Sequence, residues 1–156
     1  MSQTPARREV PAQPILGVRR VTSIEQVGAM MGELFPKLYG VLVLRLARPA
    51  GPPRSIYHSP DFDPERLDVE AALPTRRLVK GMGEAQARVL PAHQALVLLH
   101  HGPYETIEQT YRALQQAMEA QGLVSAGAPY ESYLVGPPRA KPEDYRTEVS
   151  WPVKPA

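Results

Sequence analysis

Apolar and polar residues recur along this chain with two different periods, which predict its elements. Short apolar runs bounded by glycine and proline are typical of strands, whereas apolar residues repeated every three or four positions indicate helices. The pattern predicts strands over residues 15–21, 54–58, 67–74, 84–92, 94–101, 130–135 and 145–152. It also predicts two helices, one that follows Thr22 and one that follows Pro103.

The first helix is expected to begin at Thr22, because Glu25 three residues later completes a capping box. Its buried face is expected to consist of Ile24, Val27, Met31, Leu34 and Phe35. Pro36 should end or kink this helix, and residues 37–50 fit either a broken helix or an extended segment. The second helix should end at Gly122. Its buried face is expected to consist of Ile107, Tyr111, Leu114 and Met118.

The second half of the chain repeats the first. GPPRSIY at 51–57 aligns with GAPYESY at 127–133, and EAALP at 70–74 aligns with EVSWP at 148–152. Two matches in register, within the same order of strand, helix, strand and strand, indicate an internal duplication. We predict an α+β fold in which two βαββ units form one antiparallel sheet, with both helices on one face and a pseudo-twofold crevice between the units.

The same pattern predicts the domain organisation. Residues 1–14 are polar, basic and without period, which predicts a tail that is disordered or lies on the surface. One domain should span 15–156, with repeats at about 15–75 and 84–153. We interpret the basic segment 75–83 between the repeats as a solvated linker.

Composition excludes several classes of protein. A chain of 156 residues and 17.2 kDa suits one domain, and the absence of cysteine excludes disulfides, thiolate metal sites and cysteine nucleophiles. A net charge of +2 is too small to favour nucleic acid, although the pI is about 9.0. No apolar run approaches the roughly 18 residues of a membrane helix, and no signal peptide is evident. We therefore expect a soluble, cytoplasmic protein.

Asymmetry between the repeats indicates where chemistry could take place, since a crevice between duplicated units is a common ligand site. Glu131 replaces Ser55 in the alignment, and Glu131 shares a strand face with Tyr133, the counterpart of Tyr57. A carboxylate beside tyrosine rings suits a lipophilic cation, to which each ring can contribute ~0.5–2 kcal/mol. In the alternative reading the tyrosines are ordinary sheet aromatics and Glu131 is a solvated edge residue.

Other chemistries have weaker support. His100 and His101 are adjacent on a predicted strand and point to opposite faces, so we expect no metal site. The chain has no nucleophile elbow and no phosphate loop, and we expect no cofactor. Glu70 and Glu148 occupy equivalent positions in the repeats, which favours a structural role such as a cross-strand pair.

Four segments together resemble a known family. They are GPPRSIYHSPDFDPERLDVEAALP at 51–74, HHGPYETIEQTYRALQQAMEAQG at 100–122, GAPYESYLV at 127–135 and DYRTEVSWPV at 144–153. In order and spacing they resemble the GyrI-like small-molecule-binding family. This is the effector-binding domain of bacterial MerR-type and AraC-type multidrug regulators, and it also occurs alone.

The resemblance implies a stand-alone binding protein for bulky aromatic, often cationic compounds. Glu131 matches the glutamate at the base of the family's pocket, and Tyr145 and Tyr133 match pocket positions. Methionines of the first helix would line one wall, with core packing as the alternative. The complete expected ligand-binding set is Glu131, Tyr133, Tyr145, Tyr57, Tyr104, Tyr111, Met30, Met31, Leu34 and Trp151.

The resemblance leaves two other functions open. Some relatives resemble hydrolases that open the cyclopropane rings of DNA-alkylating compounds, and in such an enzyme Glu131 would act as general base and Tyr145 or Tyr133 as proton donor. Others inhibit DNA gyrase, which would make this chain a protein-binding module. We expect lipophilic aromatic or cationic small molecules as partners, with a regulator or gyrase as a further one. We expect no nucleic-acid or membrane binding, and either a monomer or a homodimer.

Overall fold

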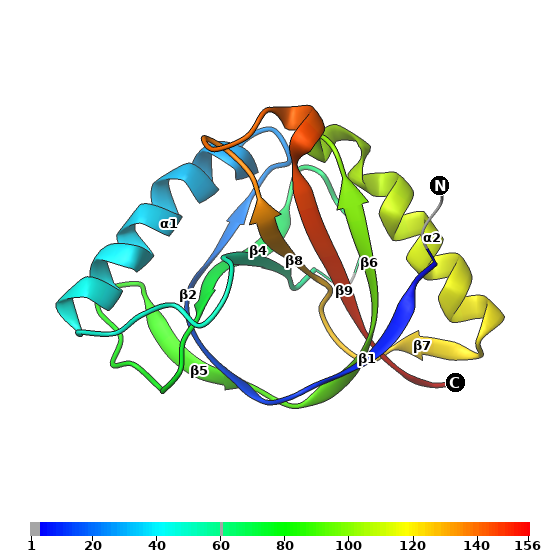
Figure 1. Ribbon diagram of the computed structural model, residues 1–156, viewed down its shortest axis with the longest axis horizontal. Helices are drawn as coiled ribbons and strands as arrows, with labels where there is room; N and C mark the ends of the chain where they lie inside the picture. The colour runs from blue at the N-terminus through cyan, green and yellow to red at the C-terminus, as the bar shows by residue number, and fades with distance from the viewer. Residues whose placement is uncertain (1–3, 60) are drawn as a thin grey trace. The chain divides into compact units, whose positions relative to one another are not determined.

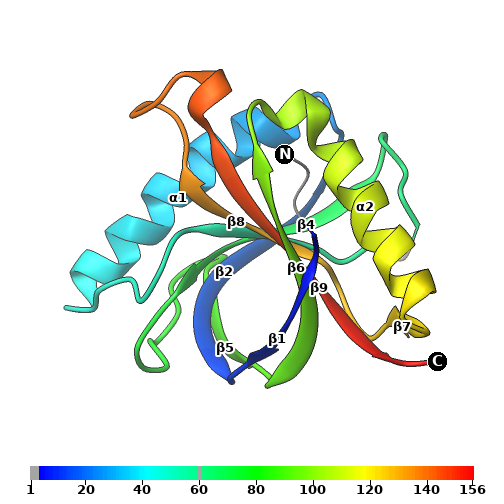
Figure 2. The same cartoon turned by 45° about the vertical axis from the view of Figure 1, so that its right-hand side comes forward.

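Each half of the duplicated sequence builds a set of antiparallel strands with one long helix packed against them (Figures 1 and 2). The computed structural model describes residues 4–59 and 61–156, which divide into two units. The first-half unit comprises residues 12–91, and the second-half unit comprises residues 4–11 and 92–156. The predicted α+β class is confirmed. The predicted crevice between the units stays a prediction.

The first-half unit has the strand order β3–β4–β2–β5, with every neighbouring pair antiparallel. Its elements are β2 (Gln13–Thr22), α1 (Val27–Leu44), β3 (Arg54–Tyr57), β4 (Leu67–Pro74) and β5 (Gln86–Leu90). The helix packs on β4 and β2, and apolar side chains from these three elements form the core of the unit together with Val79 and Ala85.

The second-half unit has the order β1–β6–β9–β8, and a short strand, β7, pairs with the end of β9. Its strands are β1 (Ala6–Val10), β6 (His93–His101), β7 (Leu123–Ser125), β8 (Tyr130–Val135) and β9 (Arg146–Pro155). Its helical elements are the 3₁₀ turns η1 (Tyr104–Thr106) and η2 (Pro142–Asp144) and the helix α2 (Ile107–Ala120). Helix α2 packs against β6 (Figure 2). Its residues Leu114 and Met118 belong to the hydrophobic core of the unit.

Helix α1 differs from the prediction at both ends. It begins at Val27 after Gln26, and Thr22 is instead the last residue of β2, so the expected capping box does not form. Pro36 lies inside the helix, which continues to Leu44. The helix tolerates proline here because Gly32, whose carbonyl loses its hydrogen bond, lies on the exposed face and can bond to water.

The expectation that no apolar segment is long enough to span a membrane is wrong for α1. Its 18 residues have a mean hydropathy of 1.4, which meets that requirement by length and composition. However, one face of the helix is buried against the strands of its own unit, as is typical of a core helix. This face consists of Met30, Met31, Leu34, Leu38, Val41 and Leu42.

The prediction of a tail over residues 1–14 is wrong for Ala6–Val10, which forms β1, and for the start of β2. The sequence pattern did not predict β1, because four of its five residues are exposed and the segment therefore shows no apolar alternation. A repeated motif marks it, since Arg8 precedes Pro11-Ala12 as Arg88 of β5 precedes Pro91-Ala92. The duplication thus extends upstream of residue 15.

Equivalent ion pairs join strands in both units, as the duplicated glutamates predict. Glu70 of β4 bonds to Arg88 of β5, and Glu148 of β9 bonds to Arg8 of β1 at 2.9 Å. Gly17 leaves room for the Glu70 carboxylate, because a Cβ at residue 17 would lie 2.6 Å from Glu70 Oε2. Both glutamates therefore have a structural role.

Candidate functional site

Glu131 lies on β8, the last strand in the order of the second-half unit, opposite Val149 of β9. Only 6% of Glu131 is exposed. The hydroxyl of Tyr111 on α2 donates a hydrogen bond to Glu131 Oε2 at 2.7 Å, and the hydroxyl of Tyr133 donates to Oε1 at 3.1 Å. The carboxylate therefore faces the helix, and the alternative of a solvated edge residue is excluded.

The electrostatics of Glu131 are those of a buried acid with neutral donors. Burial raises the pKa of its carboxyl group, and the hydrogen bonds from Tyr111 and Tyr133 only partly oppose this rise. Within residues 4–59 and 61–156, Glu131 forms no ion pair. A cation that reached the carboxylate would find its negative charge uncompensated.

Aromatic rings surround this carboxyl group. The ring of Tyr104 packs edge-on against Tyr133, with centroids 5.7 Å apart, and stacks on Tyr145 at 5.0 Å. Tyr111, which donates to the other carboxylate oxygen of Glu131, meets Trp151 edge-on, with ring centroids 6.0 Å apart. Burial, together with Tyr145 and Glu131, raises the pKa of Tyr104 to about 12, so its hydroxyl remains neutral at physiological pH.

A turn after β6 positions Tyr104. Gly102 has a φ of 105°, which a residue with a side chain rarely adopts, and the turn leads through Pro103 into η1. Buried His100 fixes the turn, because its Nε2 donates to the Pro103 carbonyl at 2.9 Å and its Nδ1 contacts Thr110 Oγ1 at 2.8 Å. The sequence analysis considered His100 only as a metal ligand and argued against that role. The sequence around the turn did not predict that His100 anchors it.

The remaining predicted residues lie in the first-half unit. Met30, Met31 and Leu34 are buried in its hydrophobic core, with Tyr57 packed against that core. Ser55, the counterpart of Glu131, contacts Met31 Sδ through its hydroxyl oxygen at 3.6 Å.

The structure thus brings six of the ten predicted residues together in one unit. Glu131, Tyr133, Tyr104 and Tyr145 form one connected group, and Tyr111 extends it to Trp151. Because this group combines one buried acid with five aromatic rings, it can hold a cation or, with water present, act as a base. The ligand-binding role of the group stays a prediction.

Comparison with solved structures supports the fold. The C-terminal domain of EcmrR has 22% sequence identity, a TM-score of 0.90 and full coverage of both chains. In the EcmrR–DNA complex, the match covers 98% of this chain but 58% of the EcmrR chain, at 23% identity and a TM-score of 0.86. This chain therefore spans little more than half of EcmrR.

Two further structures have the same fold at lower similarity. A hydrolase from Listeria innocua matches at 18% identity and a TM-score of 0.73, with 97% of this chain and 92% of that chain covered. SAV2435 bound to tetraphenylphosphonium matches at 14% identity and a TM-score of 0.58, with 97% and 94% covered. No curated protein matches the chain. At these identities the structures show the fold alone.

The family model gives the identification. The model of the GyrI-like small molecule binding domain matches residues 3–154, which include every helix and nearly every strand residue described above. The match begins before β1, in agreement with the upstream extension of the duplication. This chain therefore belongs to the family of GyrI-like small molecule binding domains.

Proposed function

We propose that the chain binds bulky aromatic, often cationic small molecules against Glu131 and the surrounding tyrosines. The observation that carries this proposal is the buried carboxyl group of Glu131, which is held by two tyrosine hydroxyls and has no cationic partner among the described residues. Ionising a buried carboxyl group is costly when no cation is near it, and becomes favourable when a cation binds beside it. Tyrosine and tryptophan faces add cation–π attraction of ~0.5–2 kcal/mol each.

The comparisons support this ligand class. SAV2435 is bound to tetraphenylphosphonium, a lipophilic cation with four aromatic rings, and EcmrR carries a domain of this fold within a DNA complex. By analogy, we propose that this chain acts in the cytoplasm as a multidrug-type sensor or sequestering protein. Four further residues are included in the proposed ligand-binding set because the family resemblance implies them. They are Tyr57, Met30, Met31 and Leu34.

Titration with dyes of different charge tests the proposal. Rhodamine 6G serves as the cationic ligand and Nile red as the neutral one, and fluorescence anisotropy reports binding. The single tryptophan, Trp151, adds an intrinsic signal because its ring contacts Tyr111. We expect Glu131→Gln to weaken rhodamine binding by about tenfold or more and Nile red binding by less than about threefold.

Glu148→Gln is the matched control, since Glu148 is a more exposed glutamate of the same unit. It should leave both affinities unchanged. Equal losses for the cationic and neutral dyes in Glu131→Gln would remove charge compensation as the basis of binding.

Hydrolysis is a second candidate, favoured by the neighbouring hydrolase fold and by the raised pKa of Glu131, which suits a general base. In this reaction water attacks a carbon of a cyclopropane that is conjugated to a dienone, and Glu131 accepts the proton of the water. The electron pair of the broken C–C bond passes to the dienone carbonyl, and Tyr133 or Tyr145 protonates the phenolate oxygen that forms. Incubation with a cyclopropane-containing indole tests it. Product formation that is lost in Glu131→Gln supports the enzyme, whereas binding without turnover supports a binding protein alone.

A further inference from the structure

The C-terminal end of α1 carries an unusual leucine. Leu46 has a φ of 54° and is 93% exposed. It follows the helix in a Schellman-type ending, in which the Ala47 amide donates to the Leu42 carbonyl at 2.9 Å. Glycine is the usual residue at this position because a side chain strains a left-handed backbone.

The second-half unit provides an internal comparison. There the residue at the same place after α2 is Gly122, with a φ of 66°. Leu46 thus strains a position that glycine fills elsewhere in the same chain, and its exposed side chain adds nothing to the core. Because Leu46 is strained and yet its side chain does not stabilise the fold, it points to a role in contacts outside the folded unit.

Leu46 belongs to a larger exposed apolar surface. It is flanked by other exposed apolar side chains from the end of α1 and from the segment before β5. Together they are Val43, Leu44, Leu46, Leu78 and Met82. The two segments lie side by side, since the Arg45 guanidinium donates to the carbonyls of Lys80 and Gly81 at 3.1 Å.

Cationic residues accompany these apolar side chains in both segments. Residues 43–50 and 75–83 contain no aspartate or glutamate, and their cations are Arg45, Arg48, Arg76, Arg77 and Lys80. Across the described residues, none of these five forms an ion pair with a carboxylate. The apolar and cationic residues together are called the basic–apolar patch below. This patch includes the segment that the sequence predicted to be a plain solvated linker.

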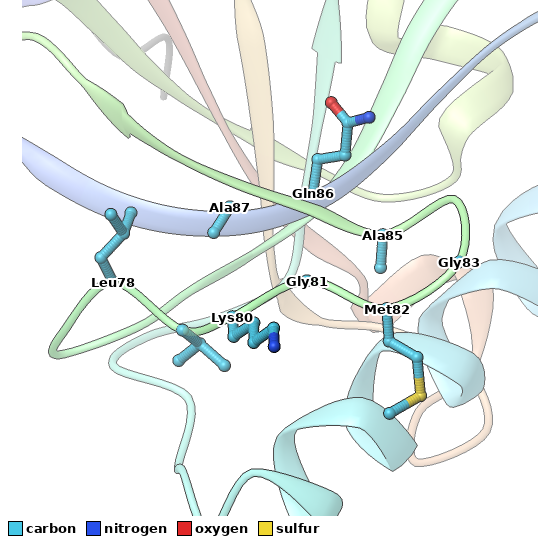
Figure 3. Close-up of a pocket in the computed structure, with 9 residues that line it drawn as sticks. Leu78, Lys80, Gly81, Met82, Gly83, Ala85, Gln86 and Ala87 are labelled. Carbon is cyan, nitrogen blue, oxygen red and sulfur yellow. The ribbon is translucent and has the colours of Figure 1, made fainter.

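A hollow adjoins the patch within the first-half unit. It has a volume of about 610 Å³ and is lined by residues 78–83 and 85–87. Figure 3 shows Leu78 and Lys80 on one arm, Ala85 to Ala87 on the other, and Met82 close to the turn. A flat lipid surface would leave this hollow empty, whereas side chains that protrude from a docked protein segment can enter it.

We propose that the basic–apolar patch docks an acidic, amphipathic segment of a partner protein. Apolar side chains of that segment would pack against Leu46, Leu78 and Met82, and one would enter the hollow. Its carboxylates would compensate Arg48, Arg76 and Lys80. This surface belongs to the first-half unit, whereas Glu131 lies in the second-half unit, so the proposal is independent of the small-molecule function.

A labelled peptide tests the docking. The probe is a fluorescein-labelled helix that presents leucines on one face and glutamates on the other, and anisotropy reports its binding to the full chain. We expect binding that weakens with salt, and a loss of about tenfold in Leu46→Gly. Urea unfolding should show that this variant is at least as stable as the native chain, because glycine relieves the strain.

Four controls separate the outcomes. Phe62→Ser and Arg139→Glu remove an exposed apolar side chain and a cation elsewhere, and both should bind the peptide like the native chain. The double variant R48E/K80E should lose the acidic peptide and gain binding of a version with lysine in place of glutamate. A scrambled peptide should bind at least about tenfold more weakly than the amphipathic one.

The proposal is overturned if Leu46→Gly binds the peptide as well as the native chain does, or if no binding occurs. It is also overturned if phosphatidylglycerol vesicles bind through the patch and the peptide does not, because the occupant would then be a membrane. Leu46→Asn repeats the test with a second residue that tolerates a positive φ.

Discussion

Tyr111 of α2 and Glu131 of β8 meet through a hydrogen bond of 2.7 Å, and their counterparts in the first-half unit, Met31 and Ser55, also touch, at 3.6 Å. Tyr111 and Met31 are each the fifth residue of their helices. The duplicated fold thus keeps the same contact between helix and strand and changes its chemistry. In one copy a serine hydroxyl donates to a thioether sulfur, and in the other a tyrosine hydroxyl donates to a buried acid.

The raised pKa of Glu131 predicts how cation binding depends on pH. Below that pKa the carboxyl group is protonated, so a cation must displace a proton to bind. We expect the affinity for rhodamine 6G to fall by up to about tenfold per pH unit as the pH drops through the raised pKa. Titrations between pH 4.5 and 8 measure this slope.

In Glu131→Gln the affinity for rhodamine should be flat over the same range, and Nile red should show no slope in either protein. If the cation affinity of the native chain is also independent of pH, Glu131 is not the charge partner of the ligand.

The buried carboxyl group of Glu131 also predicts a difference in stability between the native chain and Glu131→Gln. The folded state holds the proton of Glu131 to a higher pH than the unfolded state, so this group contributes less to stability as the pH rises from 4.5 through the folded pKa. Glu131→Gln should therefore raise the free energy of unfolding by roughly 1–2 kcal/mol above that pKa, and the difference should shrink at lower pH.

Urea unfolding without ligand at pH 8 and pH 4 measures both values. The glutamine Oε1 can accept from one of the two tyrosine hydroxyls, and its Nε2 can donate to the hydroxyl oxygen of the other, so both contacts can persist in the variant. A variant that is less stable than the native chain at pH 8 would show that the ionised carboxylate stabilises the fold.

The two duplicated glutamates should differ in their contribution to stability. Glu70 is buried and bonds to both His58 and Arg88, whereas Glu148 bonds to the more exposed Arg8. Burial raises the pKa of Glu70, but the hydrogen bonds from His58 and Arg88 outweigh it and hold the pKa below its usual value. We expect Glu70→Gln to cost about 2 kcal/mol and Glu148→Gln less than about 0.5 kcal/mol.

Since the pKa of Glu70 is lowered, its contribution is present above the unfolded value of 4.5 and is lost as the pH falls through the folded pKa. The gap between the native chain and Glu70→Gln, measured by urea unfolding, should close below pH 4. Equal effects of the two substitutions at pH 7 would contradict the role assigned to burial.

Local patterns in the sequence were sufficient for the duplication and for most strands. The matched segments around Tyr57 and Tyr133 located β3 and β8, because a period of two and flanking glycine and proline depend only on neighbouring residues. The exposed strand β1 and the continuation of α1 through Pro36 were not predictable in this way. Both depend on partners distant in sequence, which are β6 for the strand and β4 for the helix.

By itself the sequence determined the duplicated α+β plan, the family and the asymmetric glutamate at residue 131. Only the tertiary structure decided that this glutamate is buried beneath Tyr111, and that Met30, Met31 and Leu34 belong to the core of the first-half unit. It also placed the strained Leu46 beside a basic loop. Burial and charge pairing depend on which segments meet in space, and no local period of apolar residues encodes that.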